Sequence, residues 1–439
     1  MTAAAGRTVD QVIDDSKLSS FQVLALVQCA AILFLDGFDI QTMSLAVPAI
    51  AAEWGLERNA FSGALSASLF GILVASFLIG PIGDYLGRKP LALGALLLVA
   101  VSTFAAPFST DLGQLTMWRF LTGLGLGAGM PNAYALATEI APSRIRSPVL
   151  VAMASTVAAG ALTAGFIAPW LMSESDWRMV FYVGGALPLI ACAVLAFALP
   201  ESPRLLAARK WEDPRIGRFL ARIHPGQVVS IVPGAAGPAP KAPVVALFSR
   251  QFLFATLLLW ASYTLVSFVL YLLISWLPSL LTGAGWSQAD ALRGSVLIQL
   301  GGIIGGVAYA FYVTRGKPHY ALVAAMGLAV LSISLFWVTP PTFLMWSLIL
   351  VALGAGVSGA LFALIAVAGG AYPAAMRATG LSYMVGVSRF AAAISPLVGG
   401  VLLSMGYETI AVLSLLIVPI ALAALAALLL PRAMPRGVA

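Results

Sequence analysis

Long apolar stretches separated by short polar breaks dominate this chain of 439 residues. A helix needs about 20 mainly apolar residues to cross a bilayer. The pattern predicts an all-α polytopic membrane protein with twelve transmembrane helices. We place these spans at 21–47, 60–82, 89–108, 114–138, 148–172, 178–199, 251–280, 291–313, 320–338, 342–368, 377–403 and 409–430.

A polar segment divides the predicted spans into six and six. Its Pro- and Gly-rich stretch, from Val232 to Pro240, is typical of a flexible linker. The first twenty residues carry no apolar segment, so we expect no cleavable signal peptide. The predicted organisation is a cytoplasmic tail at 1–20, a six-helix bundle at 21–199, a cytoplasmic linker at 200–250, a second six-helix bundle at 251–430 and a cytoplasmic tail at 431–439.

The basic residues predict the orientation, because cytoplasmic loops carry an excess of Lys and Arg. With the N-terminus inside, nineteen of the 24 Lys and Arg residues fall on the inner face and three on the outer face. Arg119 and Arg389 fall inside predicted spans. Both termini are therefore predicted to be cytoplasmic, in a bacterial-type inner membrane.

The two halves of the chain repeat at a period of about 230 residues. Gly87-Arg88-Lys89-Pro90 matches Arg315-Gly316-Lys317-Pro318, and Pro142-x-x-x-Arg146 matches Pro373-x-x-x-Arg377. Parallel six-span repeats predict two bundles related by an axis along the membrane normal, with a substrate site between them near the midplane.

Composition supports the membrane class and argues against enzymes. Charged residues make up 9% of the chain, against roughly 25% in a soluble domain. The net charge of +7 follows from the bias of basic residues to the inner face, so it indicates no nucleic-acid partner. Cys29 and Cys192 both fall in spans, so we expect no disulfide framework. We find no metal-ligand cluster, phosphate loop or nucleophile–base set, and we expect no enzyme activity and no cofactor.

Two carboxylates, Asp36 and Asp39, interrupt the first predicted span. Each costs roughly 3 kcal/mol at the centre of a membrane helix on insertion scales. Their i, i+3 spacing puts both on one helix face. A paired acid site at this depth indicates proton or cation movement, and the alternative is a structural ion pair with an intramembrane Arg.

Arg389 lies in the middle of the span at 377–403. Its planar guanidinium can bind a carboxylate through two hydrogen bonds. The sequence therefore predicts an anion clamp at Arg389. The alternative is charge balance for an acid in another span.

Several motifs resemble the major facilitator superfamily. The run from Gly80 to Lys89, G-P-I-G-D-Y-L-G-R-K, resembles its loop 2–3 signature, although Tyr85 replaces the usual basic residue. We expect this segment to act as a latch between conformational states, since glycines allow close packing and the acid can bind a helix N-terminus or an Arg. A purely topogenic role for its charges is the alternative. The predicted gating residues are Gly80, Gly83, Asp84, Gly87, Arg88 and Lys89.

Within the superfamily, nearly the whole chain is similar to the aromatic acid:proton symporters. Asp36-Gly37-Phe38-Asp39 matches their D-G-[FY]-D signature, and Arg119-Phe120-Leu121-Thr122-Gly123 with Met130-Pro131-Asn132 matches their fourth span. Trp276-Leu277-Pro278 and Gly386-x-x-Arg389 resemble their seventh and eleventh spans.

The resemblance implies a proton-coupled importer of a small organic anion such as a hydroxybenzoate, working as a monomer in the bilayer. Proton coupling would involve Asp36, Asp39, Arg119 and Glu139, where Glu139 is either a second proton station or a partner of Arg144 or Arg146. Arg389 would bind the carboxylate. Aromatic stacking partners would come from Phe38, Tyr263, Tyr271, Phe362 and Tyr383, and polar contacts to ring hydroxyls from Gln41, Asn132, Gln299 and Ser382. Taken singly, an aromatic residue in such a span more often serves ordinary packing, because apolar residues dominate both pockets and cores.

Other transport classes remain as alternatives. Muconates, lactones and phenoxyacids would also fit a clamp beside an apolar pocket. The run Pro200-Glu201-Ser202-Pro203-Arg204 is shared with sugar porters, but the seventh span lacks their paired glutamines. The fifth span, around Gly165-Phe166-Ile167-Ala168-Pro169, does not match the motif of drug:proton antiporters. A membrane sensor on the same fold is a further alternative, disfavoured because the chain has no fused soluble domain.

Overall fold

The computed structural model describes residues 7–78, 82, 85–173, 176–209, 212–224, 244–314 and 318–433. Each element in these ranges is an α-helix or a short 3₁₀ helix. The predicted all-α fold class is therefore confirmed. Among the predicted latch residues, Gly80, Gly83 and Asp84 lie outside the described residues, as do residues 315–317 of its second copy and the Pro- and Gly-rich stretch at 232–240.

The long helices follow the predicted spans one by one. The N-terminal half contains α2 (Ser20–Trp54), α3 (Ser62–Leu78), α5 (Arg88–Ala105), α6 (Leu112–Ile140), α7 (Arg146–Ser173) and α8 (Arg178–Ala198). The C-terminal half contains α11 (Leu253–Gly283), α12 (Gln288–Thr314), α13 (Pro318–Leu335), α14 (Phe343–Ala371), α15 (Ala374–Ser404), α16 (Thr409–Leu415) and α17 (Ile417–Ala433). The last predicted span is thus divided between α16 and α17.

Ten segments of the described chain are long and apolar enough to cross a membrane. The helices α6 and α13 do not meet that standard. The apolar part of α13 spans only His319–Leu335. Helix α6 carries two charged residues, Arg119 and Glu139, and five of the seven residues in its segment Gly123–Gly129 are glycine or alanine. Their crossing therefore remains a prediction from the sequence and depends on burial against neighbouring helices.

The ends of α2 show how local sequence sets a helix boundary. Ser19 and Gln22 form a capping box, in which each side chain accepts a hydrogen bond from the other residue's backbone N–H. The Gln22 side chain also donates to the carbonyl oxygen of Ile140 at 3.0 Å, joining α2 to the end of α6. At the other end Gly55 adopts the left-handed conformation, φ +63°, which favours glycine and stops the helix.

The internal repeat is visible in the way the helices pack. In the first half α3 packs on α6, where Gly71 faces the carbonyl of Phe120 and Gly123 faces the carbonyl of Ser68. In the second half α12 packs on α14 through glycines at the corresponding positions, Gly301 and Gly354. Gly71 and Gly301 are 230 residues apart, and Gly123 and Gly354 are 231 apart, which matches the period seen in the sequence.

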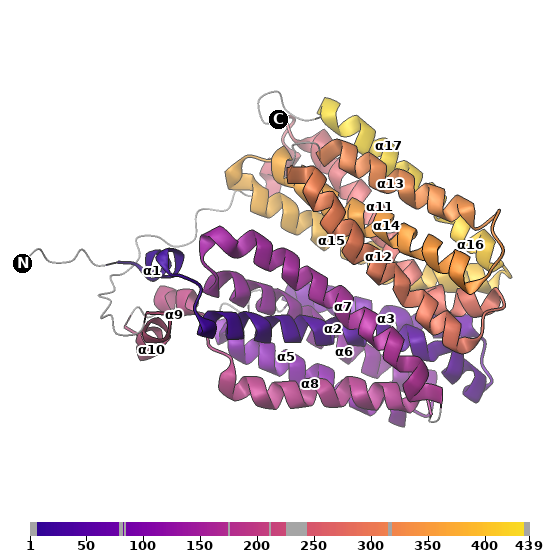
Figure 1. Cartoon of the computed structure of the whole chain (residues 1–439), viewed down its shortest axis with the longest axis horizontal. Coiled ribbons are helices and arrows are strands. Elements are labelled where there is room, and N and C mark those ends of the chain that lie inside the picture. The colour runs from indigo at the N-terminus through magenta and orange to yellow at the C-terminus, as the bar shows by residue number, and fades with distance from the viewer. Residues whose placement is uncertain are drawn as a thin grey trace, which may run out of the picture.

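The two six-helix bundles lie against each other along most of their length (Figure 1). Three pairs of long helices form most of the interface: α2 with α11, α3 with α15, and α7 with α12. The 3₁₀ helix Arg58–Phe61 of the first half also contacts α15. A substrate site between the bundles would lie among these helices.

Three short helices gather at one end of the molecule, which we call the tail end (Figure 1). They are α1 (Val9–Asp15), α9 (Pro203–Arg209) and α10 (Pro214–Ile223). The sequence pattern predicts a tail and a linker for these residues, so the three helices are a feature that only the structure shows. The tail end is the predicted cytoplasmic face, and the other end of the bundles is called the outer end.

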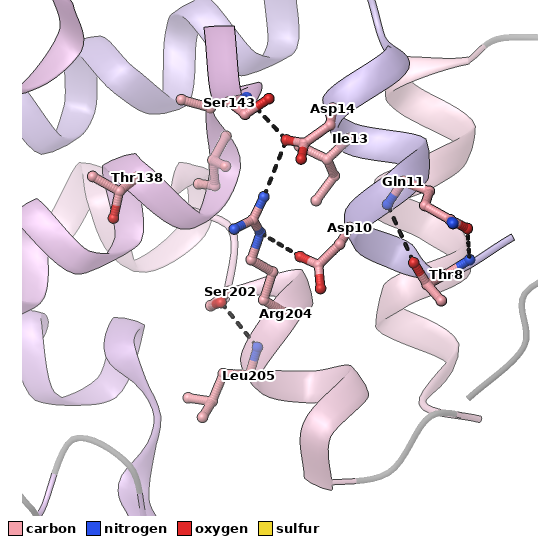
Figure 2. A network of polar contacts seen from close by, with 12 residues as sticks. Thr8, Asp10, Gln11, Ile13, Asp14, Thr138, Ser143, Ser202, Arg204 and Leu205 are labelled. Atoms are coloured by element: carbon pink, nitrogen blue, oxygen red, sulfur yellow. Dashed lines mark hydrogen bonds and ion pairs between the residues drawn. The ribbon is translucent and has the colours of Figure 1, made fainter. Parts of the chain in front are cut away.

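Charged groups fasten α1 to the rest of the tail end (Figure 2). Asp14 accepts hydrogen bonds from the backbone N–H of Ser143 at 2.9 Å and from Arg146 at 2.8 Å. Arg204 of α9 pairs with Asp10 at 2.9 Å and with Asp14 at 3.3 Å. Burial lowers the pKa of the Arg204 guanidinium, and these two carboxylates act in the opposite direction. The network ties α1 to α9 and to the start of α7.

We expect Gly123→Ala to destabilise the protein, because the added Cβ would lie 2.0 Å from the Ser68 carbonyl oxygen. Overpacking of this kind costs about 1–3 kcal/mol. Thermal unfolding of the purified protein in detergent measures the effect. Gly94→Ala in α5 is the matched control, because its Cβ would meet no atom within 4 Å and helix propensity favours alanine by about 1 kcal/mol. Equal unfolding midpoints for the two variants would contradict the close approach of α3 and α6.

Candidate proton and substrate site

An ion pair lies at the centre of the N-terminal bundle. Asp39 of α2 and Arg119 of α6 are both fully buried, and Arg119 Nη1 lies 3.1 Å from Asp39 Oδ2. The Thr103 hydroxyl of α5 donates to Asp39 Oδ1 at 2.6 Å. Arg119 Nη2 also donates to the backbone oxygen of Asp39, at 3.4 Å. Three helices are thus joined by charge-assisted hydrogen bonds.

The second carboxyl, Asp36, has different surroundings. It is 2% exposed, and its Oδ2 atom has no hydrogen-bond partner in the described part of the chain. It lies beside Gly129 of α6, where an added Cβ would be 3.8 Å from Oδ2. An isolated carboxylate is costly in an apolar interior, and such groups usually become neutral instead. The two acids on one face of α2 therefore divide into one that is paired with Arg119 and one that is not.

Arg389 lies at the interface between the bundles. Its Nη1 atom donates to the hydroxyl of Ser76, so α15 of the second bundle contacts α3 of the first. The phenol groups of Tyr263 and Tyr271, both on α11, are close enough to interact with it electrostatically. This arrangement brings a partly buried cation and two tyrosines together where α3, α11 and α15 meet.

The other aromatic residues named from the sequence lie in varied places. Phe38 is buried inside the N-terminal bundle. Its ring packs beside Gly184 of α8, where an added Cβ would lie 3.5 Å from Phe38 Cε1. Tyr383 is 42% exposed and stacks on Trp260 with ring centres 6.3 Å apart. Phe362, 37% exposed, packs toward Gly306 of α12. The structure groups only Tyr263 and Tyr271 with Arg389.

The polar candidates show unused hydrogen-bonding capacity. Gln41 donates to Ser44 at 3.2 Å and Asn132 donates to the Ala128 carbonyl at 2.8 Å, both within their own helices. The amide oxygens of Gln41 and Asn132 are buried without a partner among the described residues. Gln299 is half-buried and Ser382 is exposed. Free buried acceptors suit a donor on a ligand, such as a ring hydroxyl.

Glu139 pairs with Arg88, not with Arg144 or Arg146. The Arg88–Glu139 distance is 3.5 Å, across the tail ends of α5 and α6. Arg144 instead donates to the backbone oxygen of Ser16, at 2.6 Å, and Arg146 binds Asp14. If Glu139 serves as an ion-pair partner and not as a proton station, its partner is therefore the predicted latch residue Arg88.

A second carboxylate, that of Glu201, contacts the latch residues that the structure describes. Glu201 Oε1 accepts hydrogen bonds from the backbone N–H groups of Arg88 at 2.9 Å and Lys89 at 3.2 Å. A Cβ on Gly87, where φ is +111°, would lie 2.4 Å from Glu201 Oε2. The positive φ favours glycine at position 87, and a larger residue would also displace the Glu201 carboxylate.

Thr103, Ser76 and Glu201 are site residues that sequence reasoning missed. Thr103 and Ser76 are ordinary hydroxyl residues in apolar helices, and only helix packing brings them to Asp39 and Arg389. Glu201 belongs to the run Pro200-Glu201-Ser202-Pro203-Arg204, which the sequence analysis treated only as a sign of kinship with sugar porters. The described residues contain no group of three or more His, Cys, Asp or Glu that could hold a metal ion.

Comparisons with known proteins identify the family. The sequence profile of the Major Facilitator Superfamily matches residues 29–362. The 4-hydroxybenzoate transporter PcaK of Pseudomonas aeruginosa is 36% identical, over 96% of this chain and 95% of that protein. A gallate transporter of Pseudomonas putida is 35% identical, over 95% of this chain and 93% of that protein. These relatives are transporters, in agreement with the expectation that the chain is not an enzyme.

The fold also matches a solved transporter structure. The xylose transporter XylE of Escherichia coli, in a partially occluded inward-open conformation, superposes with a TM-score of 0.72. The match covers 95% of this chain and 98% of that one, at 15% sequence identity, so it establishes the fold alone. The predicted resemblance is confirmed: the chain belongs to the major facilitator superfamily and is a multi-pass membrane transporter.

Proposed function

We propose that this transporter imports aromatic carboxylic acids such as hydroxybenzoates together with protons. Relatives that share about a third of their residues along nearly their whole length carry 4-hydroxybenzoate and gallate in their names, and both compounds are hydroxylated aromatic carboxylates. The observation that carries the proposal is the separation of buried charge, with unpaired Asp36 and the Asp39–Arg119 pair in one bundle and Arg389 between the bundles.

Asp36 is the proton carrier in this proposal. A protonated Asp36 can stay buried without a counter-ion, whereas an ionised one needs water or a cation. Asp39 is already neutralised by Arg119 and held by Thr103. Release of the proton from Asp36 would therefore require its surroundings to open, which couples protonation to the conformational change.

Arg389 is the substrate clamp. Its present partner is a neutral hydroxyl, that of Ser76, and a carboxylate would be a stronger acceptor. Replacement of Ser76 by the substrate carboxylate would alter the contact between α3 and α15. Tyr263 and Tyr271, which lie near Arg389, would contact the aromatic ring. The free amide oxygens of Gln41 and Asn132 are candidates to accept from its hydroxyl groups.

Alternating access would follow from rocking of the two bundles about this site. At the outer end Arg58 of the first bundle donates to the Ser279 carbonyl at 3.0 Å and to the Thr282 hydroxyl at 2.7 Å in the second. Opening to the outside must break these bonds. The Arg88–Glu139 and Glu201 contacts at the tail end belong to the cytoplasmic latch. We further propose an inner-membrane location, a monomer, both termini in the cytoplasm, and the proton gradient as the driving force with no cofactor.

Transport can be tested with the purified protein in proteoliposomes. With an inward proton gradient we expect 4-hydroxybenzoate or a related hydroxybenzoate to accumulate above its external concentration. A protonophore should abolish the accumulation. A panel of benzoate, gallate, muconate and glucose defines the substrate class. Accumulation of muconate or glucose alone would reject the aromatic assignment, and accumulation insensitive to the protonophore would reject proton coupling.

Asp36→Asn should separate transport from proton coupling. The amide mimics the protonated carboxyl, so we expect exchange of labelled for unlabelled substrate to continue while gradient-driven uptake only reaches equilibrium. Asp39→Asn is the comparison, because it leaves Arg119 buried without its counter-ion, at a cost of about 3–5 kcal/mol. That variant should lose thermal stability, and Asp39→Asn combined with Arg119→Gln should regain part of it. Normal uphill uptake by Asp36→Asn would show that Asp36 does not carry the proton.

Arg389→Lys should weaken substrate binding while it keeps the charge. Lysine lacks the planar fork that matches a carboxylate. Loss of one charge-assisted hydrogen bond weakens affinity by roughly 10- to 150-fold. Isothermal titration with 4-hydroxybenzoate measures the effect. Ser76→Ala is the control, since it removes the present partner of Arg389 and should leave affinity equal or higher. Wild-type affinity in Arg389→Lys would assign Arg389 to structure rather than to binding.

A further inference from the structure

A second cavity lies at the tail end of the N-terminal bundle, away from the proposed transport site. Its volume is about 360 Å³, within the range of roughly 300–1,000 Å³ that small-ligand sites occupy. The ends of three membrane helices contribute to its wall: Phe21 of α2, Lys89 of α5, and Leu199 directly after α8. The rest of the wall comes from Pro200 and Glu201, from Leu206 of α9, and from the amphipathic helix α10, which lies next to the ends of the membrane helices (Figure 1).

The helix α10 presents two different faces. Its apolar side chains, Ile216, Phe219, Leu220 and Ile223, are buried against the bundle. Its basic side chains Arg215, Arg218 and Arg222 all line the cavity, and they are exposed to solvent. With Lys89 at the start of α5, four basic residues line the cavity.

Two nearby acids, Asp213 and Glu201, offset only part of this charge. Asp213 binds Arg215, with Arg215 Nη2 to Asp213 Oδ2 at 2.8 Å. Glu201, the one acid in the cavity wall, has one oxygen that accepts from the backbone N–H groups of Arg88, Lys89 and Ser202. The side chains of Lys89, Arg218 and Arg222 form no ion pair with any carboxylate in the described part of the chain. The cavity therefore keeps a positive charge that suits an anion.

One of these cations is held in place by an aromatic ring. The guanidinium of Arg222 lies over the ring of Phe21, 4.9 Å from its centre. Phe21 in turn packs edge-on against Phe219, with ring centres 5.5 Å apart. This stacking fixes the direction of Arg222 at the cavity without using its hydrogen-bond donors.

The surroundings of the cavity indicate where the anion comes from. Two turns or less from Phe21, α2 exposes the apolar side chains of Leu24 and Val27, and α8 exposes Val194 and Phe197 just before Leu199. The helices α2 and α8 pack side by side. Exposed apolar side chains on a membrane-spanning helix face lipid tails. A basic pocket directly below such a surface is in position for a phospholipid headgroup.

We propose that this cavity binds the phosphate group of an anionic phospholipid from the cytoplasmic leaflet, with Lys89, Arg218 and Arg222 as its ligands. The acyl chains would lie along the exposed apolar faces of α2 and α8. A bound phosphate would connect α10 to Lys89, whose backbone already contacts Glu201. The lipid would thus hold α10 against the start of α5.

The test uses the full-length protein in detergent and measures binding of short-chain lipids by microscale thermophoresis. The probes are dioctanoyl phosphatidylglycerol, dioctanoyl phosphatidylcholine, glycerol 3-phosphate and inorganic phosphate. We expect saturable binding of phosphatidylglycerol and much weaker binding of phosphatidylcholine. Arg218→Gln with Arg222→Gln should weaken phosphatidylglycerol binding roughly 30-fold, as expected for two basic residues at an anionic lipid surface.

Arg250→Gln is the matched control, because Arg250 is an exposed residue at the same end of the molecule but outside the cavity. It should bind phosphatidylglycerol like the unmodified protein. Phosphatidylglycerol should also raise the unfolding midpoint of the unmodified protein and of Arg250→Gln, but not of the double variant. The single variant Arg218→Gln, at an exposed position, serves if the double variant does not fold.

Equal binding by the double variant and by Arg250→Gln would overturn the proposal. Binding of inorganic phosphate or glycerol 3-phosphate as tightly as the lipid would keep the phosphate site and reject the lipid as its source. The experiment measures no transport. Its result is therefore independent of whether the proposed substrate and proton coupling are correct.

Discussion

The ion pair between Asp39 and Arg119 is the contact on which the centre of the N-terminal bundle depends. Either charge alone would cost several kcal/mol in that apolar interior. Together, and with the Thr103 hydroxyl, they join α2, α5 and α6 at one point. Because this pair satisfies Asp39, Asp36 is left as a buried acid without a counter-ion among the described residues. The proposed proton site thus follows from the unequal distribution of one positive charge between two carboxylates.

The two bundles carry different buried charges and have different roles in the proposed cycle. The first bundle holds the acids and their arginine, and the second contributes Arg389, which reaches across to Ser76 of the first. A proton on Asp36 changes the charge inside one bundle, and a carboxylate on Arg389 changes the contact between them. Coupling between proton and substrate then needs no direct contact between the two ligands, only a shared dependence on how the bundles meet.

Close packing of backbones makes this arrangement rigid within each bundle. In lipid, helices associate through small residues, because the hydrophobic effect offers little drive between them. Gly71 and Gly123 in one half, and Gly301 and Gly354 in the other, bring helix backbones into contact at corresponding positions. At the bundle interface the outer end also has polar contacts, those of Arg58 with α11. Hydrogen bonds of this kind can break and re-form during a cycle, whereas the glycine contacts keep each bundle intact.

The sequence by itself determined the class, the helices and the candidate charges. Runs of about 20 apolar residues leave only a helix as the way to satisfy backbone hydrogen bonds in lipid, so the positions of the long helices of both bundles followed from hydropathy. The repeat was readable because its matched residues lie in short loops. Asp36, Asp39, Arg119 and Arg389 were identifiable because charge is rare at that depth. The tertiary structure alone decided which charges pair, because helix packing determines which Arg lies beside a buried carboxylate. Asp39 and Arg119 are 80 residues apart in the sequence. For the same reason the sequence did not show that Thr103, Ser76 and Glu201 would contact these groups. The apolar residues of α10 do repeat at helical spacing in the sequence, but only the packed bundle decides which surface they cover.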